Sequence, residues 1–200
     1  MKTVPKGMIF STFALLLFLL LQACMVPENF KAQIMVREDG SYHFAYEGNL
    51  ASVFALAAIK EGSFTQKNES EMREEAKNLK KEPGFKSAEY IGKGRYRVSV
   101  VKSGKPGEAY DFISRDMQII SIQPEAGNIL LIKTWEPGAE DIEQIRMLGA
   151  EMKGLLEIQV PKAMTVIEHD SKQKPEKDKT QTTYTWKISM DSPSAKIRLK

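Results

Sequence analysis

The chain has little cysteine and histidine: Cys24 is its only cysteine, and His43 and His169 are its only histidines among 200 residues. A single cysteine excludes a disulfide within the chain, and a free thiol is a liability in an oxidising compartment. A zinc site usually needs three or four ligands at recognisable spacings, which this sequence does not offer. We interpret Glu168-His169-Asp170 as a solvated loop rather than a metal ligand or a base. No metal and no cofactor are predicted.

Sequence motifs of the common enzyme classes are missing as well. No Gly-x-Ser-x-Gly elbow, P-loop or dinucleotide fingerprint occurs, and Gly92-Lys93-Gly94 fits a hairpin turn better than a phosphate cradle. The 26 acidic residues offer only chance pairs, which do not support glycosidase chemistry. The sequence therefore predicts a protein that is not an enzyme, and an enzyme of unknown class ranks third among the functions considered.

An excess of charge of one sign is also absent. Without residues 1–23 the chain keeps 27 lysines and arginines against 26 aspartates and glutamates, a net charge of +1. Nucleic-acid binders concentrate positive charge to neutralise phosphates, whereas here the two signs are interspersed. The sequence predicts no nucleic-acid partner.

The uninterrupted apolar run Phe13–Leu21 is too short to cross ~30 Å of hydrocarbon, which takes about 20 helical residues. Lys2 and Lys6 precede it, the first 24 positions hold no acidic residue, and the small Ala23 stands before Cys24. This order of features is typical of a secretory signal peptide, so residues 1–23 are predicted to be removed.

Leu21-Gln22-Ala23-Cys24 resembles the lipobox of bacterial lipoproteins, although Gln22 stands where a smaller residue is usual. The resemblance implies that a diacylglyceryl group joins the thiol of Cys24, that cleavage makes Cys24 the first residue, and that its new amine can be acylated too. Two or more acyl chains anchor a protein stably to a membrane. The alternative is an ordinary secretory signal with a chance cysteine.

Residues 24–29 are predicted to form a short lipidated tether, which leaves the following domain close to the membrane surface. Met25, and not an aspartate, follows the cysteine. By resemblance to lipoproteins of enteric-type bacteria, this implies delivery to the outer membrane, facing the periplasm, if the host is diderm. The predicted localisation is extracytoplasmic, on a membrane, by a lipid anchor.

Residues 30–200 have the length of a single domain with its own core. Apolar and polar residues alternate over 30–36 and 41–46, as in half-buried strands, and Asp39-Gly40 between them is a strong hairpin signal. Alternation or short apolar runs bounded by turn residues predict further strands at 85–91, 95–102, 117–123, 128–135, 155–160, 163–168, 182–190 and 195–199.

Three helices are predicted. Residues 50–60, capped by Asn49, are apolar on almost every side, which favours burial over the alternative of a helix lying in the bilayer surface. Residues 68–82 begin with a capping-box pattern of Asn68 and Glu71 and carry one apolar stripe, as a surface helix resting on a sheet does. Residues 139–153 are amphipathic.

Strands dominate and helices are interspersed, so the predicted fold class is α+β: a curved antiparallel β-sheet with helices packed on one face. Residues 171–180, SKQKPEKDKT, are rich in charge and have nothing apolar to bury. This composition predicts a mobile loop.

Several short motifs, taken with this order of elements, resemble the LppM-type domain of bacterial envelope lipoproteins. They are Phe85-Lys86-Ser87, Gly92-Lys93-Gly94-Arg95, Gly154-Leu155-Leu156-Glu157-Ile158, Pro161-Lys162-Ala163 and Tyr184-Thr185-Trp186. The resemblance implies an α+β domain with a cavity for lipid or glycolipid. This sequence departs from the family in lacking a C-terminal membrane segment, which leaves Cys24 as the predicted anchor.

Two functions are therefore predicted. The first is a non-catalytic module that binds lipid or glycolipid in a cavity between residues 50–59 and the sheet, with Phe54, Tyr96, Trp135 and Trp186 as candidate lining, although strand aromatics are more often plain core. The second is an envelope scaffold that holds an envelope protein partner by an exposed sheet edge or helix. A closed apolar cavity would favour the first function, and a filled core with an exposed apolar patch the second.

Overall fold

The computed structural model describes residues 25–114 and 117–200. The predicted signal peptide and the lipidation site, Cys24, lie outside these residues. Among the helices that are described, none has the length and apolar character needed to cross a membrane.

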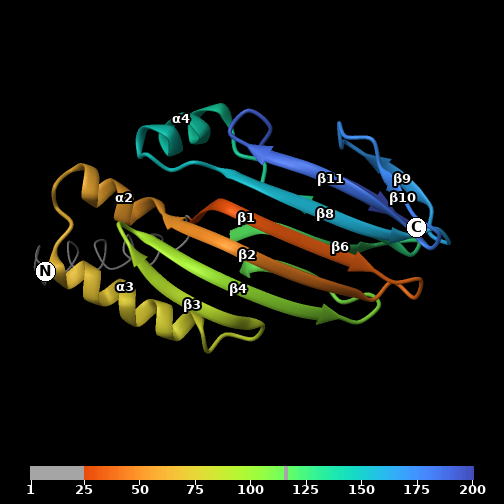
Figure 1. Ribbon diagram of the computed structural model, residues 1–200, viewed down its shortest axis with the longest axis horizontal. Helices are drawn as coiled ribbons and strands as arrows, with labels where there is room; N and C mark the ends of the chain where they lie inside the picture. Colours follow the sequence, from red (N-terminus) through yellow and green to blue (C-terminus); the bar gives the residue numbers. More distant parts are fainter. Residues whose placement is uncertain (1–24, 115–116) are drawn as a thin grey trace, which may run out of the picture.

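A seven-stranded sheet makes up the larger part of the molecule, with the strand order β10-β11-β8-β1-β2-β4-β3 (Figure 1). Its strands are β1 (Met25–Val36), β2 (Tyr42–Ser52), β3 (Phe85–Gly92), β4 (Arg95–Gly104), β8 (Lys153–Pro161), β10 (Glu176–Lys177) and β11 (Gln181–Ser189). Neighbouring strands are antiparallel except β1 and β8, which run parallel.

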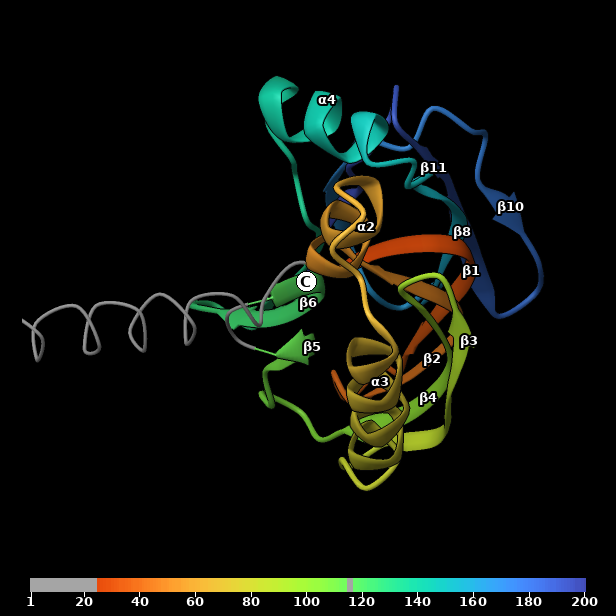
Figure 2. The same cartoon turned by 90° about the vertical axis from the view of Figure 1, so that its left-hand side faces the viewer.

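A second, five-stranded sheet has the order β5-β6-β7-β12-β9. Its strands are β5 (Tyr110–Ser114), β6 (Met117–Glu125), β7 (Ile129–Thr134), β9 (Val166–His169) and β12 (Lys196–Leu199). It packs on the concave side of the larger sheet (Figure 2), where the ring of Phe112 lies 5.4 Å from that of Phe44 and 4.5 Å from that of Tyr46. The hydrophobic core lies between the two sheets.

Three helices, α2 (Val53–Lys60), α3 (Gln66–Leu79) and α4 (Ala139–Met147), lie at the end and on the concave side of the larger sheet (Figure 2). α3 lies along β3 and β4, where the hydroxyl of Tyr90 donates to Glu69 at 3.0 Å and that of Tyr96 to Glu75. The opposite face of the larger sheet is left uncovered, and its side chains are accordingly polar for the most part.

The predicted α+β class, with a curved sheet and helices on one face, is confirmed. The opening hairpin is also confirmed: Gly40 has a φ of 81°, and the carboxylate of Asp39 accepts a hydrogen bond from the amide of Ser41 at 2.9 Å. The structure adds two features, the division of the strands into two sheets and the parallel β1–β8 pair. The β1–β8 pair joins residues 124 positions apart, and β12 joins the second sheet through residues of β7 that lie 63 or more positions away. Local alternation does not encode such pairings.

The predicted helix over 50–60 starts later than expected and is less buried. Leu50 and Ala51 belong to β2, because they pair with Tyr96 and Arg95 of β4, and Ser52 rather than Asn49 caps the helix. Within α2 only Ala55 and Leu56 are buried, so the prediction of a helix enclosed on all sides is wrong. Leu50 and Ala51 fit the helical pattern locally, but their pairing with β4 makes them part of the sheet.

The other two helices also differ at their ends. α3 begins earlier, because Thr65 and Asn68 form the capping box instead of Asn68 and Glu71. α4 ends at Met147, where Gly149 adopts a φ of 73°, so the C-terminal part of the predicted helix 139–153 becomes a connection leading into β8.

Two strands lie outside the predicted ones. The first, β5, contributes Phe112 to the core. Residues 171–180 include β10, which pairs with β11, and Ser171 donates a hydrogen bond to the carbonyl of Thr185 at 2.6 Å. The mobility of this segment stays a prediction.

Candidate functional site

The structure does not bring the four candidate cavity residues together. Phe54 on α2 is 38% exposed, and Tyr96 on β4 is fully buried beneath α3. Trp186 on β11 is buried and donates from its indole to Asp170 at 2.7 Å. β4 and β11 are separated by three strands, so Tyr96 and Trp186 lie about 19 Å apart along the sheet at ~4.8 Å per strand.

Trp135, the fourth candidate, follows β7 and borders a small enclosed space between the two sheets. Its other walls include Phe30, Ile119, Met152 and Ile188, and its volume is about 10 Å³. That is room for about one water molecule, whereas ligand pockets hold roughly 300 to 1,000 Å³. This part of the core is filled by protein side chains.

Glu168-His169-Asp170 is exposed to solvent, as predicted, but Glu168 and His169 belong to the strand β9 and not to a loop. Glu168 forms ion pairs with Lys196 and Arg198, both at 2.9 Å, while the ring of His169 packs edge-on against Tyr184. Asp170 accepts hydrogen bonds from Trp186 and from the amide of Lys196. The three side chains therefore hold neighbouring strands and do not converge on one point.

The histidines and acids elsewhere are also dispersed. The imidazole Nδ1 of His43 lies 3.1 Å from the hydroxyl of Ser103 across β2 and β4. Within residues 25–114 and 117–200, no three histidine, cysteine, aspartate or glutamate side chains are grouped so that they could hold a metal ion.

A wider hollow lies instead on the uncovered face of the larger sheet. It is a broad depression of about 680 Å³ over β1, β2, β4 and β3, within the size range of small-molecule sites. Its lining is mostly polar: Asn29, Phe30, Lys31, Glu47, Gly48, Asn49, Ser87, Arg97, Val98 and Ser99. We take this polar depression as the candidate site.

A β-bulge in β1 shapes the polar depression. The register between β1 and β2 shifts between Glu28 and Lys31, and Asn29 within the bulge has a φ of 46°. Asparagine tolerates this left-handed conformation better than most residues. Gly48 lies opposite, where a Cβ atom would stand 2.4 Å from the Cβ of Phe30, so glycine is required for the two strands to approach.

The depression offers several polar groups to a ligand. The side chains of Arg97, Glu47 and Ser99 have no hydrogen-bond partner among the described residues. The ammonium group of Lys31 lies 3.1 Å from the carboxylate of Glu157, which also accepts a hydrogen bond from the side-chain amide of Gln33 at 2.7 Å. A free guanidinium with amides and hydroxyls around it can bind a polar, oxygen-rich group through several hydrogen bonds.

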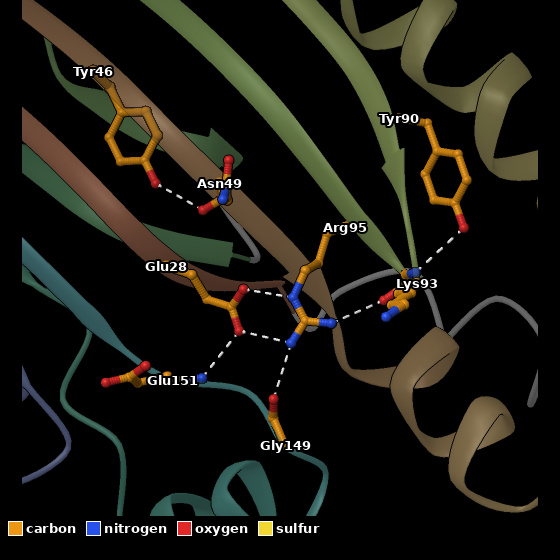
Figure 3. Close-up of polar contacts among 9 residues, drawn as sticks. Glu28, Tyr46, Asn49, Tyr90, Lys93, Arg95, Gly149 and Glu151 are labelled. Carbon is orange, nitrogen blue, oxygen red and sulfur yellow. Dashed lines mark hydrogen bonds and ion pairs between the residues drawn. The ribbon is translucent and has the colours of Figure 1, made fainter.

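An ion pair between Glu28 and Arg95 supports the bulge from inside the protein (Figure 3). The guanidinium donates to both carboxylate oxygens, at 2.8 and 3.2 Å, and also to the carbonyls of Gly149 and Lys93. Glu28 is 4% exposed and accepts a further hydrogen bond from the amide of Glu151 at 3.0 Å. These bonds connect β1, β4 and the segment before β8, so they fix the inner side of the sheet next to the depression.

Burial and the nearby Glu28 carboxylate raise the pKa of Tyr46 far above its ordinary value. The Tyr46 hydroxyl stays protonated and donates to the carbonyl of Asn49 at 3.3 Å, which positions the β2 backbone beside the depression.

Comparison with known proteins leaves the family open. No family model and no curated protein matches the chain. Among solved structures it is similar to an M1 zinc metallopeptidase from Deinococcus radiodurans, at 9% identity and a TM-score of 0.39 over 89% of this chain. A two-domain M1 zinc metallopeptidase mutant bound to L-tryptophan gives 10% identity and a TM-score of 0.40. The chain spans about 42% of the length of the first of these, and at such TM-scores the likeness supports no function.

The sequence alone does not single out the depression. Alternation correctly places Lys31 and Arg97 on the polar faces of their strands, but a polar strand face is also what plain solvent exposure requires. The bulge at Asn29 and the alignment of β1, β2 and β4 bring these residues together, and neither has a local signal.

Proposed function

We propose that the chain is a membrane-anchored envelope lipoprotein, lipidated at Cys24, whose domain is a non-catalytic module that binds the polar head of a lipid or glycolipid. The lipobox-like Leu21-Gln22-Ala23-Cys24 and the resemblance to LppM-type domains support this proposal. The localisation proposed with it is extracytoplasmic, on the outer membrane facing the periplasm if the host is diderm.

The observation that carries the binding proposal is the polar depression beside the start of β1. Asn29 and Lys31 are five and seven residues from Cys24, which is about 16 to 23 Å in an extended strand. Because the head-group layer of a bilayer is only about 5 to 8 Å thick, a ligand that reaches this far needs an extended head group, such as the saccharide of a glycolipid. The filled space near Trp135 offers no comparable room, so we place the ligand on the open face and not between the sheets.

Replacing Cys24 with Ala tests the anchor. Cells fed labelled palmitate should label the wild-type chain and not the C24A variant, which should remain as an uncleaved or unlipidated precursor. Met25→Ala is a matched control at the neighbouring position and should be processed and labelled normally. Normal processing and labelling of the C24A variant would contradict the lipid anchor.

Replacing Arg97 with Ala tests the binding site. The chain is purified from its own membrane in detergent, and the lipid that remains bound after washing is quantified by mass spectrometry. A hydrogen bond to a charged group contributes about 1.5 to 3 kcal/mol, so R97A should bind lipid or glycolipid roughly 10- to 150-fold more weakly and retain correspondingly less of it. Arg37→Ala, which removes another exposed arginine from the β1–β2 turn, should retain the wild-type amount. If the wild type, R97A and R37A retain equal amounts of lipid, the polar depression is not the binding site.

A scaffold that holds another envelope protein is the second candidate. The filled space between the sheets favours it, and so does β3, an edge strand of eight residues at the border of the larger sheet. If no lipid is retained and a crosslinker placed at Arg97 or Lys86 captures an envelope protein, the scaffold function replaces the first proposal.

A further inference from the structure

Apolar side chains are unevenly distributed on the surface. In the part of the chain that the structure describes, five large hydrophobic side chains are exposed: Met35, Phe54, Ile59, Met147 and Ile167. Phe54 and Ile59 belong to α2 and Met147 to α4, and both helices lie at one end of the molecule, the end that faces the viewer in Figure 2. We call this the helical end.

A hydrogen bond connects α2 and α4 at the helical end. The ammonium group of Lys60, the last residue of α2, donates to the carbonyl of Met147, the last residue of α4, at 2.9 Å. At its start α2 is capped by the hydroxyl of Ser52, whose amide donates to the carbonyl of Gly94 at 2.8 Å. The exposed side chains are therefore carried by helices that are fixed to the sheet.

The helical end is also where the described chain begins. Met25 pairs with Ser52, the residue that caps α2, and Cys24 directly precedes Met25. The predicted tether over 24–29 is not a separate linker, because residues 25–29 belong to β1. The predicted lipidation site therefore directly precedes the sheet. α2 spans eight residues, about 12 Å at 1.5 Å per residue, so Phe54 and Ile59 lie within a short distance of the anchor. A membrane that holds the protein through a lipid on Cys24 must lie against this end.

We propose that the helical end rests on the bilayer surface, with Phe54, Ile59 and Met147 inserted among the lipid head groups beside the anchor. This inference rests on the proposed attachment of the chain to the membrane through its N-terminal residues. Apolar side chains of such interfacial helices reach about 5 to 10 Å into the boundary between head groups and acyl chains. The strands of the larger sheet, which run along the length of the molecule (Figure 1), then extend away from the membrane.

Single tryptophans placed at exposed positions can test this orientation. The full chain is reconstituted into vesicles of phosphatidylethanolamine and phosphatidylglycerol, with and without brominated acyl chains, which quench nearby tryptophan. Phe54→Trp and Met147→Trp report on the helical end. Met35→Trp and Ile167→Trp are matched controls, because the native side chains are 44% and 46% exposed but lie elsewhere. Emission of the wild type, which has two tryptophans, is subtracted.

The expected result is a blue shift and loss of the added emission at positions 54 and 147 in brominated vesicles, with neither change at positions 35 and 167. Equal emission at all four positions would overturn the proposal. A blue shift at 54 and 147 without loss to bromine, rising with protein concentration, would also overturn it, because a second copy would then cover the helical end.

The intact mass of the protein in the same samples shows independently whether Cys24 carries a lipid. If bromine quenches the tryptophans at 54 and 147 but the protein has no added lipid mass, the proposed orientation stands and the proposed lipidation of Cys24 is rejected. Lipid mass without quenching would keep the anchor and reject the orientation.

Discussion

Glu28 holds the start of the larger sheet to the segment in front of β8. Its carboxylate is almost completely buried and meets the Arg95 guanidinium through two hydrogen bonds, while the amide of Glu151 donates a third. Removing one member of a buried ion pair leaves the other charge without its partner, at a cost of about 3 to 5 kcal/mol. Arg95 keeps its bonds to Gly149 and Lys93, which favours the lower end of that range.

Glu28→Ala should therefore lower the free energy of unfolding by about 3 kcal/mol, measured by urea denaturation of residues 25–200. The matched control is Glu71→Ala, which removes an exposed partner of Lys67 at 3.6 Å on α3. Such surface pairs contribute about 0.5 kcal/mol or less. Similar losses for the two variants would show that the buried pair contributes no more than a surface pair.

At the scale of elements, the central strands approach closely around the ring of Phe30. Phe30 stacks on Tyr46 with ring centroids 5.5 Å apart. Gly154 of β8 pairs with Phe30, and a Cβ atom added at Gly154 would stand 2.3 Å from the ring. The absence of a side chain at Gly154 makes room for the aromatic ring, and its absence at Gly48 of β2 makes room for the Cα and Cβ atoms of Phe30.

Gly154→Ala should destabilise the domain by about 1 to 3 kcal/mol, the usual cost of overpacking a core. The reason is steric, so the loss should shrink when the ring is removed by Phe30→Ala. A double-mutant cycle followed by thermal unfolding measures this coupling. If Gly154→Ala costs the same in both backgrounds, contact with Phe30 is not its cause.

At the scale of the whole molecule, tyrosines form much of the core. Tyr42, Tyr46 and Tyr96 are fully buried, and burial is the main cause that raises the pKa of each hydroxyl well above its ordinary value of 10. Burial likewise raises the pKa of Tyr110 to about 12. The folded protein thus keeps these hydroxyls protonated at a pH where the unfolded chain releases their protons.

The stability from these tyrosines should be fully present below about pH 10 and lost as the pH rises from there through the folded pKa. The loss should be about 1.4 kcal/mol per pH unit for each tyrosine, measured by urea denaturation at a series of alkaline pH values. Tyr42→Phe is the matched variant, because the buried Tyr42 hydroxyl has no hydrogen-bond partner among the described residues. It should be at least as stable as the wild type at neutral pH and lose stability less steeply above pH 10. An unchanged slope would exclude Tyr42 as a contributor.

Some features of the fold can be predicted from the sequence and others cannot. The Asp39-Gly40 turn and the inward faces of β1 and β2 follow from local patterns, and they are correct because alternation records which side of a strand is buried. The start of α2 is wrong because Leu50 gains a strand partner, Tyr96, that lies 46 residues further along the chain.

By itself, the sequence determines the α+β class, the hairpin, the approximate places of three helices and the polar character of one sheet face. Each of these depends on residues within a few positions of one another. Only the tertiary structure decides that β1 runs parallel to β8, that the strands divide into two sheets, and that Asn29, Glu47 and Arg97 border one depression. The reason is physical: burial leaves a periodic record along the chain, whereas the choice of partner strand is made by packing between segments that are distant in sequence.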